Sequence, residues 1–423
     1  MTALTRELRQ RAAVLLRPAG ELGATPTTKT AGSVELMRIA LVGTRGVPAR
    51  YGGFETCVEE VGQRLAARGH EVVVYCRATN QESTAPRTYL GMTLVTLPAP
   101  KRRTLETLVH TGLSVAHLLA HRVDAAIVFN AANSPLLPAL KVAHIPVATH
   151  VDGLEWKRAK WGAAGQKYYR WAEGMAVRWS NALIADASGI QEYYASTYHA
   201  ETQLMAYGAP VLGELGTGLI REIGLEPGKF HLVVARFEPE NHVETIVEGY
   251  VRSGAMHPLV VVGSTPYSDG YTRKVRDAAD SRVRFLGGVW DQELLNQLYF
   301  HALVYWHGHS VGGTNPSLLR ALGAGAATNA FDVNFNREVL GSAGAYFSEA
   351  GQIPALVQAA ENDFAATASR GQASLDRAGS YCWDDVTDSY EALCRRLALH
   401  DFGRSSAGAQ RRSAALGHQE GMP

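Results

Sequence analysis

Short apolar segments alternate with helical patterns along this chain, and the alternation runs in two series. Continuous apolar strands separated by helices are typical of parallel sheets that are covered on both faces. The expected strands of the two series are 38–43, 71–77, 94–97, 125–130, 147–150 and 182–186, then 230–236, 258–263, 283–286, 302–306 and 326–330. The predicted fold class is therefore α/β, with two doubly wound domains that face each other across a cleft and bind ligands at the carboxyl ends of their strands.

The length and composition of the chain agree with this organisation. At 423 residues the chain is too long for one ordinary hydrophobic core. Its residues are 46% hydrophobic and 19% charged, with a formal net charge of +1, a balance that provides no overall attraction to nucleic acid. No apolar run reaches the roughly 18 residues of a membrane span. The four cysteines lie far apart with no CxxC pair, so we expect buried thiols in a reducing, cytoplasmic compartment.

The segment 307–325, HGHSVGGTNPSLLRALGAG, combines a glycine pair, small polar side chains and a proline ahead of an apolar helix. This pattern predicts a flexible loop that leads into a helix N-terminus, where backbone N–H groups and the helix dipole favour an anion such as a diphosphate. A packed glycine turn between a strand and a helix is the alternative interpretation. The candidate phosphate-binding residues in the loop are Gly312, Gly313, Thr314, Asn315 and Ser317.

A second glycine pair, Gly52 and Gly53, lies after the first expected strand and directly before a helix. The surrounding sequence lacks the spaced GxGxxG of a dinucleotide site. The strand 71–77 ends in Arg77 rather than in an acidic residue that would hold a ribose, so a nicotinamide-dependent dehydrogenase is disfavoured. A Gly-Gly turn still lets a ligand approach the backbone closely.

Arg236 ends the first strand of the second series. A guanidinium at the carboxyl end of a strand is well placed to contact a phosphate with two parallel hydrogen bonds. The alternative interpretation is a salt bridge from Arg236 to Glu238 or Glu240. Because the sequence contains neither a zinc-ligand spacing nor an Asp-x-Asp pair, we predict no metal at this site.

Six long motifs within residues 37–397 resemble a rhamnosyltransferase-like subgroup of the bacterial family 4 glycosyltransferases, which retain anomeric configuration and have the GT-B fold. The motifs are GTRGVPARYGGFETCVEEV, RGHEVVVYCR, THVDGLEWKRAKW, ARFEPENHVETIVEGY, RVRFLGGVWDQELLNQLY and GHSVGGTNPSLL. The resemblance implies a cytoplasmic, metal-independent enzyme without a cofactor, in which the nucleotide sugar is a substrate. It would move a sugar, such as rhamnose from dTDP-rhamnose, to a saccharide or polyprenyl-linked acceptor in envelope or exopolysaccharide synthesis.

The resemblance assigns Arg236 to the donor diphosphate, but three positions require comment. Asn241 stands where the wider family has a lysine, and Gly312 and Arg320 stand where it has two glutamates. A guanidinium only donates hydrogen bonds, so Arg320 cannot accept one from a ribose hydroxyl. Our hypothesis is that Arg320 faces the cleft and donates to the diphosphate, which replaces the charge missing at Asn241. The alternatives are a catalytically degenerate GT-B subunit that binds a partner protein, and a nucleotide-sugar epimerase, which the motifs disfavour.

The resemblance also suggests residues for the sugars and for the base. His150, at a strand end, corresponds to a cleft histidine near the donor-sugar hydroxyls, although a lone histidine in such a place is more often structural. Asp152 would orient it or bind the acceptor, with Glu155 and Trp156 as further acceptor contacts. No strong protein base is needed, because an oxygen of the departing diphosphate accepts the acceptor's proton. Recognition of the base falls to loops at Gly263, Phe285, Leu286 and Gly287.

The expected organisation has five parts. Residues 1–36 are a disordered extension or precede the true start, 37–208 form an acceptor domain, and 209–383 form a nucleotide-sugar domain. Residues 384–400 form a helix that packs back on the first domain, and 404–423 are a disordered tail. The basic, aromatic stretch 156–178 is interpreted as a solvated amphipathic helix, and the alternative is a face that rests peripherally on anionic lipid.

Overall fold

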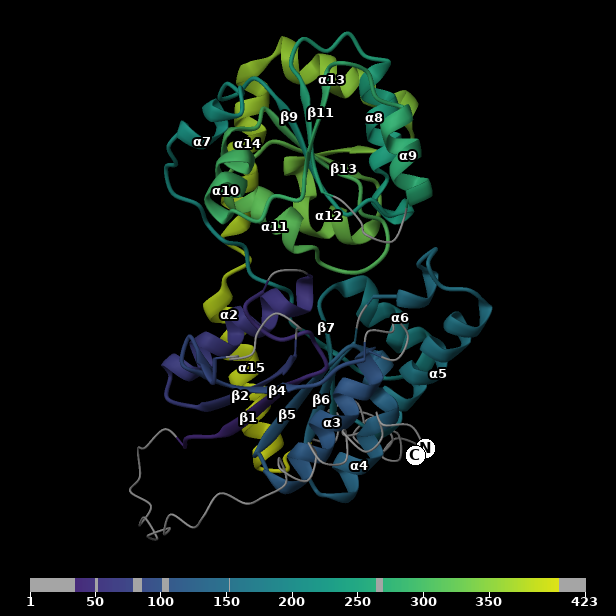
Figure 1. Ribbon diagram of the computed structural model, residues 1–423, viewed down its shortest axis with the longest axis vertical. Helices are drawn as coiled ribbons and strands as arrows, with labels where there is room; N and C mark the ends of the chain where they lie inside the picture. Colours follow the sequence, from purple (N-terminus) through teal and green to yellow (C-terminus); the bar gives the residue numbers. More distant parts are fainter. Residues whose placement is uncertain are drawn as a thin grey trace, which may run out of the picture.

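The computed structural model describes residues 35–49, 52–78, 86–100, 106–151, 153–263 and 269–402. These residues form two α/β domains, which lie one above the other in Figure 1, each around its own sheet. Residues 1–34 of the expected extension, the expected tail 404–423, and Asp152 lie outside the described residues.

The first domain contains a sheet in the order β3-β4-β2-β1-β5-β6-β7-β8, and only the pairing of β3 with β4 is antiparallel. All five residues of β5 are buried, which is why this strand reads as a continuous apolar run. The strands are β1 (Arg38–Val42), β2 (Glu71–Arg77), β3 (Thr88–Tyr89), β4 (Met92–Leu97), β5 (Ala125–Phe129), β6 (Val147–His150), β7 (Ala182–Ala185) and β8 (Gln203–Leu204).

Helices cover both faces of this sheet (Figure 1). Successive residues of β1 show the two faces, because Ile39 belongs to the core shared with α2 and Ala40 to the core shared with α3 and α4. The helices are α2 (Gly53–Ala67), α3 (Glu106–Ala120), η1 (Ala131–Leu136), α4 (Leu137–Val142), η2 (Glu155–Lys157), α5 (Ala163–Trp179) and α6 (Ser188–Tyr198).

The second domain repeats the plan with six parallel strands in the order β11-β10-β9-β12-β13-β14. The strands are β9 (His231–Val234), β10 (Leu259–Val262), β11 (Val283–Gly287), β12 (Val304–His307), β13 (Thr328–Phe331) and β14 (Gly344–Phe347). The helices are α7 (Gly218–Glu222), η3 (Pro239–Asn241), α8 (Val243–Val251), α9 (Asp269–Asp277), α10 (Gln292–His301), α11 (Pro316–Gly323), α12 (Asn334–Leu340), η4 (Gly341–Ala343), η5 (Ala350–Gln352), α13 (Ile353–Asn362) and α14 (Phe364–Ala378). Every strand expected from the sequence is present, and the predicted α/β class is confirmed.

Two connecting segments pass between the domains side by side. The backbone N–H of Ala209, on the outward segment, donates to the carbonyl oxygen of Tyr381 on the returning segment at 2.7 Å. The rings of Tyr207 and Trp383 stack with their centroids 6.4 Å apart. Gly208 is needed between them, because a Cβ at this position would overlap with the Trp383 indole.

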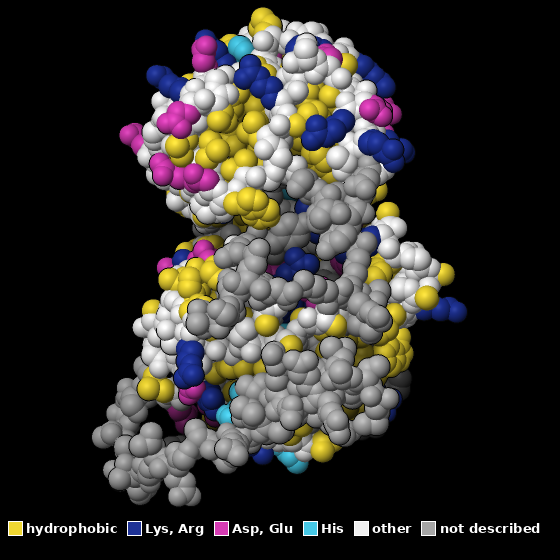
Figure 2. All heavy atoms as spheres, in the orientation of Figure 1, with side chains coloured by type: hydrophobic (Ala, Val, Ile, Leu, Met, Phe, Trp, Pro, Cys, Tyr) yellow, Lys and Arg dark blue, Asp and Glu magenta, His cyan; other side chains and the backbone are white. Residues whose placement is uncertain are grey.

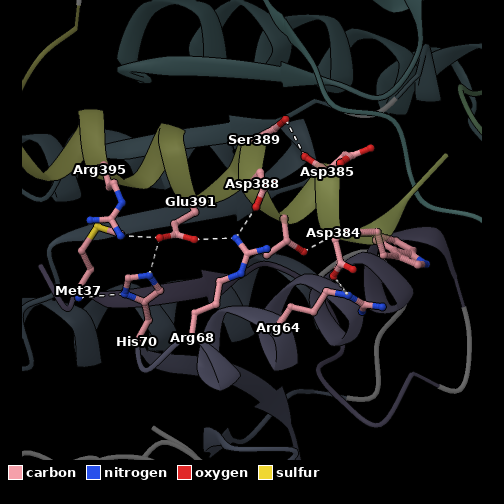
Figure 3. Close-up of polar contacts among 12 residues, drawn as sticks. Met37, Arg64, Arg68, His70, Asp384, Asp385, Asp388, Ser389, Glu391 and Arg395 are labelled. Atoms are coloured by element: carbon pink, nitrogen blue, oxygen red, sulfur yellow. Dashed lines mark hydrogen bonds and ion pairs between the residues drawn. The ribbon is translucent and has the colours of Figure 1, made fainter. Parts of the chain in front are cut away.

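The last helix, α15 (Trp383–Ala398), belongs to the first domain although it follows the second in sequence (Figures 1 and 3). Its acidic residues meet basic residues of α2 and of the turn after it: Arg64 pairs with Asp384 at 3.0 Å, and Arg68 pairs with Asp388 and Glu391, each at 2.7 Å. Its apolar side joins the core beneath β1 and α2 through Tyr390, Leu393, Cys394 and Leu397.

The visible surface of the second domain carries charges of both signs. In Figure 2, Lys and Arg side chains alternate with Asp and Glu side chains around the upper lobe, and hydrophobic side chains lie between them. Such interspersed charge creates no broad field of one sign over the described residues of this face. An anion that binds on this face therefore has to be bound by local features of a site. Within the described part of the chain, no helix has both the length and the apolar character needed to cross a bilayer.

Candidate functional site

A pocket of about 300 Å³ lies between the domains at the carboxyl ends of β9, β10 and β12. Gly52, Gly53 and Thr56 line it from the first domain. The second-domain lining comes from the loops after the strands: Val234, Ala235, Arg236, Asn241, Val262, Gly263, Gly288, Val289, Trp290, His307, Gly308, His309, Asn315, Pro316 and Ser317. The structure therefore brings six of the candidate residues together, namely Gly52, Gly53, Arg236, Gly263, Asn315 and Ser317.

The loop before α11 presents backbone N–H groups at a helix N-terminus. The amides of residues 311–315 have no acceptor among the described residues. The side-chain oxygen of Asn315 caps α11 by accepting a hydrogen bond from the Ser317 amide at 2.9 Å. The Ser317 hydroxyl donates to the Val234 carbonyl at 3.2 Å and lies 2.7 Å from the Tyr299 hydroxyl, so it is held within the second domain. The loop therefore offers an anion its amides rather than this hydroxyl.

The same loop is pressed against the first domain. Thr314 donates its hydroxyl hydrogen to the carbonyl oxygen of Asp186, which follows β7, at 2.5 Å. A Cβ at Gly313 would overlap with Oδ1 of Asp186, so a larger residue there would force the Asp186 side chain to move. Gly312 has a φ of +146°, a conformation that side chains rarely adopt. These small residues let the two domains approach at the candidate phosphate loop.

Arg236 lines the pocket and is also paired with an acidic neighbour. Its Nη1 lies 3.6 Å from Oε2 of Glu238, and its side chain is 36% exposed. The salt bridge that the sequence left as an alternative is therefore present, and Arg236 also lines the pocket. Asn241 donates from Nδ2 to the Arg236 carbonyl at 2.9 Å, and its Oδ1 lies 2.8 Å from Nδ1 of His309. Asn241 thus joins two loops of the site and adds no positive charge.

Two buried histidines of the motif, His307 and His309, line the pocket although the sequence argument did not select them. Burial lowers the pKa of His307 to about 3. Burial, followed by the charges of Arg158 and other basic neighbours, holds the pKa of His309 well below its usual range. Both imidazoles are therefore neutral at physiological pH and act as polar, uncharged walls. The spacing of two histidines at a strand end, HGH, is the signal that could have identified them.

His150 does not line the pocket. It is fully buried at the end of β6, packed against Phe54, and its Nδ1 lies 3.0 Å from the Tyr390 hydroxyl of α15. Burial lowers its pKa to about 3. This placement matches the structural alternative, and contact of His150 with a sugar stays a prediction.

The candidate acceptor residues Glu155 and Trp156 are engaged in contacts of their own. Glu155 is buried and forms ion pairs with Arg158 and Lys160, each at 2.6 Å. The guanidinium of Arg170 lies over the Trp156 ring, 4.0 Å from its centroid. Neither side chain lines the pocket. Leu154 and Lys157, which flank Glu155 and Trp156 in sequence, border a second interdomain pocket of about 260 Å³. The residues that line this second pocket are Leu154, Lys157, Ala187, Gly189, Ile190, Ser310, Val311, Gly312, Val333, Asn334 and Phe335.

Arg320 is not among the residues that line the pocket. Its Nη1 donates to Oε1 of Gln292, at the start of α10, at 3.0 Å. Leu318 and Leu319 are buried against the core, whereas Arg320 on the same helix is only partly buried and contacts α10. Contact between Arg320 and a diphosphate therefore stays a prediction.

The predicted base loops reach the pocket only in part. Gly263 lines it, and its N–H donates to the Gly287 carbonyl at 2.7 Å. Phe285 instead packs against Phe237, with ring centroids 6.2 Å apart, and Leu286 packs against the core. The residues that line the pocket on this side follow the predicted stretch directly, and they are Gly288, Val289 and Trp290.

A family model described as a domain of unknown function, DUF1972, matches residues 36–210, which span the strands of the first domain. No curated protein matches the chain. Sucrose-phosphate synthase from Thermosynechococcus elongatus is similar in structure, with a TM-score of 0.74 and 18% identity over 86% of this chain and 99% of that one. HepE from Anabaena in complex with UDP has a TM-score of 0.68 and 15% identity over 84% and 99%.

A third similar structure is an α,α-trehalose-phosphate synthase (UDP-forming) from Burkholderia vietnamiensis, with a TM-score of 0.64 and 12% identity over 85% of this chain and 99% of that one. The structural similarity establishes the architecture, whereas identities this low leave the activity open. The chain has the GT-B fold, in which two Rossmann-like domains enclose a cleft.

Proposed function

We propose that this protein is a glycosyltransferase that binds a nucleotide-sugar donor in the pocket between its domains. One observation carries the proposal: Arg236 and the N-terminus of α11, through Asn315 and Ser317, line a single pocket at the carboxyl ends of parallel strands. Cation and amide donors around one cavity are suited to a diphosphate. HepE, which has the same fold, has been crystallised with UDP and with UDP-glucose, and this supports the choice of donor class.

The chemistry of such a site is positioning and charge stabilisation. Arg236 and the loop amides would bind the diphosphate more tightly as negative charge develops on it during departure. A diphosphate oxygen can then accept the proton of the attacking hydroxyl on the same face of the sugar, which gives retention without a protein base. We propose on the same grounds that turnover needs no metal ion.

The proposed identities of the donor sugar and of the acceptor rest on the sequence motifs. We propose rhamnose from dTDP-rhamnose as a donor to be tested first, and a saccharide or polyprenyl-linked saccharide of envelope or exopolysaccharide synthesis as the acceptor. The acceptor would enter through the second pocket, beside Leu154 and Lys157. The reaction would take place in the cytoplasm, with α5 as the candidate for a peripheral membrane contact.

The test is a panel of UDP-, dTDP- and GDP-sugars, with release of nucleoside diphosphate and binding of each nucleotide as readouts. Replacing Arg236 by alanine removes a charge-assisted contact of about 1.5–3 kcal/mol. Nucleotide affinity should then fall on the order of 10- to 100-fold. Arg252→Ala is the matched control, because Arg252 lies on the surface with a side chain that is 60% exposed and pairs with Glu248. Unchanged affinity in Arg236→Ala would remove Arg236 from the site.

A non-catalytic, partner-binding GT-B subunit is the second candidate, and two observations favour it. Asn241 provides no charge where the wider family has a lysine, and Arg320 contacts Gln292 and is not among the residues that line the pocket. Nucleotide binding without turnover for any donor of the panel, at several acceptor concentrations, would support this candidate. Turnover of any one donor would exclude it.

A further inference from the structure

An exposed tryptophan lies at the edge of the candidate donor pocket. Trp290 follows β11, is 64% exposed, and lines the pocket together with Gly288 and Val289. Large aromatic side chains are usually mostly buried, because their exposure to water is unfavourable. Trp171 on α5 is the other largely exposed tryptophan among the described residues, and it does not line the pocket. An indole left open at the mouth of a cavity suggests that a ligand covers it.

The sheet order places Trp290 away from the phosphate end of the pocket. Arg236 follows β9, which lies next to β12 and its phosphate loop, whereas Trp290 follows β11, two strands from β9. Neighbouring strands are about 4.8 Å apart, so the ends of β9 and β11, from which these two loops start, are about 10 Å apart. A nucleoside diphosphate needs such a separation, because its ribose holds the base away from the phosphates.

The loop that carries Trp290 is held in place by its neighbours. A Cβ at Gly288 would lie 3.3 Å from the Trp290 indole, so the missing side chain leaves room for the ring beside the backbone. Asp291 caps α10 by accepting a hydrogen bond from the Glu293 amide at 2.9 Å. Gln292 Nε2 donates to the Trp290 carbonyl at 3.4 Å. The indole is therefore exposed on a loop that the start of α10 orders, which lowers the entropy cost of binding a ligand there.

We propose that Trp290 stacks on the nucleobase of the donor nucleotide. This inference rests on the proposed function, since it assigns the base end of the same site. Every nucleobase has a π face, so stacking on an indole tolerates a change of base. Trp290 thus contributes affinity for the nucleoside as a class, while polar groups of the neighbouring loops at Gly263 and Gly287 select among bases.

The experiment compares two kinds of probe on the full-length protein. Inorganic pyrophosphate reports the phosphate end alone, and UDP, dTDP and GDP report both ends. Trp290→Ala should weaken each nucleoside diphosphate by a similar factor, on the order of 5- to 100-fold, and leave pyrophosphate affinity unchanged. Trp290→Phe should retain most of the affinity. Quenching of tryptophan fluorescence by UDP should disappear in Trp290→Ala and persist in the matched control Trp171→Ala.

The outcomes separate this inference from the function on which it rests. A wild-type protein that binds neither pyrophosphate nor any nucleoside diphosphate would contradict the proposed function itself. A wild-type protein that binds UDP, together with Trp290→Ala binding UDP equally well, would overturn only the role of Trp290. Equal weakening of pyrophosphate and UDP in Trp290→Ala would also overturn it, because the substitution would then act through the shape of the whole pocket.

Discussion

Replacing Glu391 by glutamine should weaken the attachment of α15 to the first domain (Figure 3). Burial opposes ionisation of this carboxyl, but hydrogen bonds from Arg68, Arg395 and His70 outweigh burial and lower the pKa of Glu391 to about 2. Compared with an ordinary glutamate, that change corresponds to about 3 kcal/mol in favour of the charged form. Solvent around the partly exposed guanidiniums screens part of this energy, so we expect a loss of about 2 kcal/mol at neutral pH.

The sign of the pH dependence follows from the lowered pKa. A carboxyl whose pKa is lower in the folded than in the unfolded protein stabilises the fold above the unfolded pKa, and this contribution disappears as the pH falls through the folded pKa. The difference between wild type and Glu391→Gln should therefore be full above about pH 5 and decrease toward about pH 2. Urea denaturation suits the measurement, because urea does not screen charges, and hydrogen exchange of the α15 amides reports local opening.

The matched control is Glu248→Gln on the surface of the second domain. Glu248 pairs with Arg252 at 3.6 Å through a side chain that is 40% exposed, and such pairs contribute about 0.2–1 kcal/mol. If Glu391→Gln were no more destabilising than this control, or if its effect did not depend on pH, the reasoning about the α15 network would be refuted.

Two further predictions concern the cleft. A methyl group at Gly313 would overlap with Asp186 and lie 2.8 Å from Ile190, so Gly313→Ala should hold the domains apart, enlarge the radius of gyration in small-angle scattering and weaken nucleotide binding. Gly254→Ala, where a Cβ meets nothing within 4 Å, should change neither the radius of gyration nor nucleotide affinity. If Gly313→Ala also left both quantities unchanged, the close approach of the domains at Gly313 would be unimportant for binding. Removal of divalent metals with EDTA should leave turnover unchanged, because Arg236 and loop amides are proposed to neutralise the diphosphate, and strict dependence on Mg²⁺ or Mn²⁺ would contradict this.

The buried strands were predictable from the sequence, and the short strands were not. β5, which is covered on both faces, consists only of apolar residues, and this distinguishes it from the adjacent loops. β3 and β8 have two residues each, too few to show a pattern. β14 begins with a glycine and is only partly buried over most of its length, so its pairing with β13 comes from tertiary packing rather than from local hydrophobicity.

The residues of the candidate site were likewise predictable from the sequence only in part. Gly52 and Arg236 could be selected because parallel topology gathers residues at strand ends, and both line one pocket. Arg320 could not be placed, because which face of α11 meets the cleft depends on how Leu318 and Leu319 pack. The exposure of Trp290 is likewise a property of the assembled loops, since a tryptophan in sequence is equally consistent with a core position.

The crossing of α15 has a consequence for how the chain folds during synthesis. Leu393 and Leu397 complete the hydrophobic core that also contains Ile39 and Leu41, so the first domain is assembled from both ends of the described chain. While the ribosome translates the second domain, the apolar face of β1 and α2 remains uncovered, because α15 has not yet been synthesised. We therefore expect the second domain, which is continuous in sequence, to mature first. A chain released before α15 should be a target for chaperones and proteases, even though the second-domain lining of the interdomain pocket is complete.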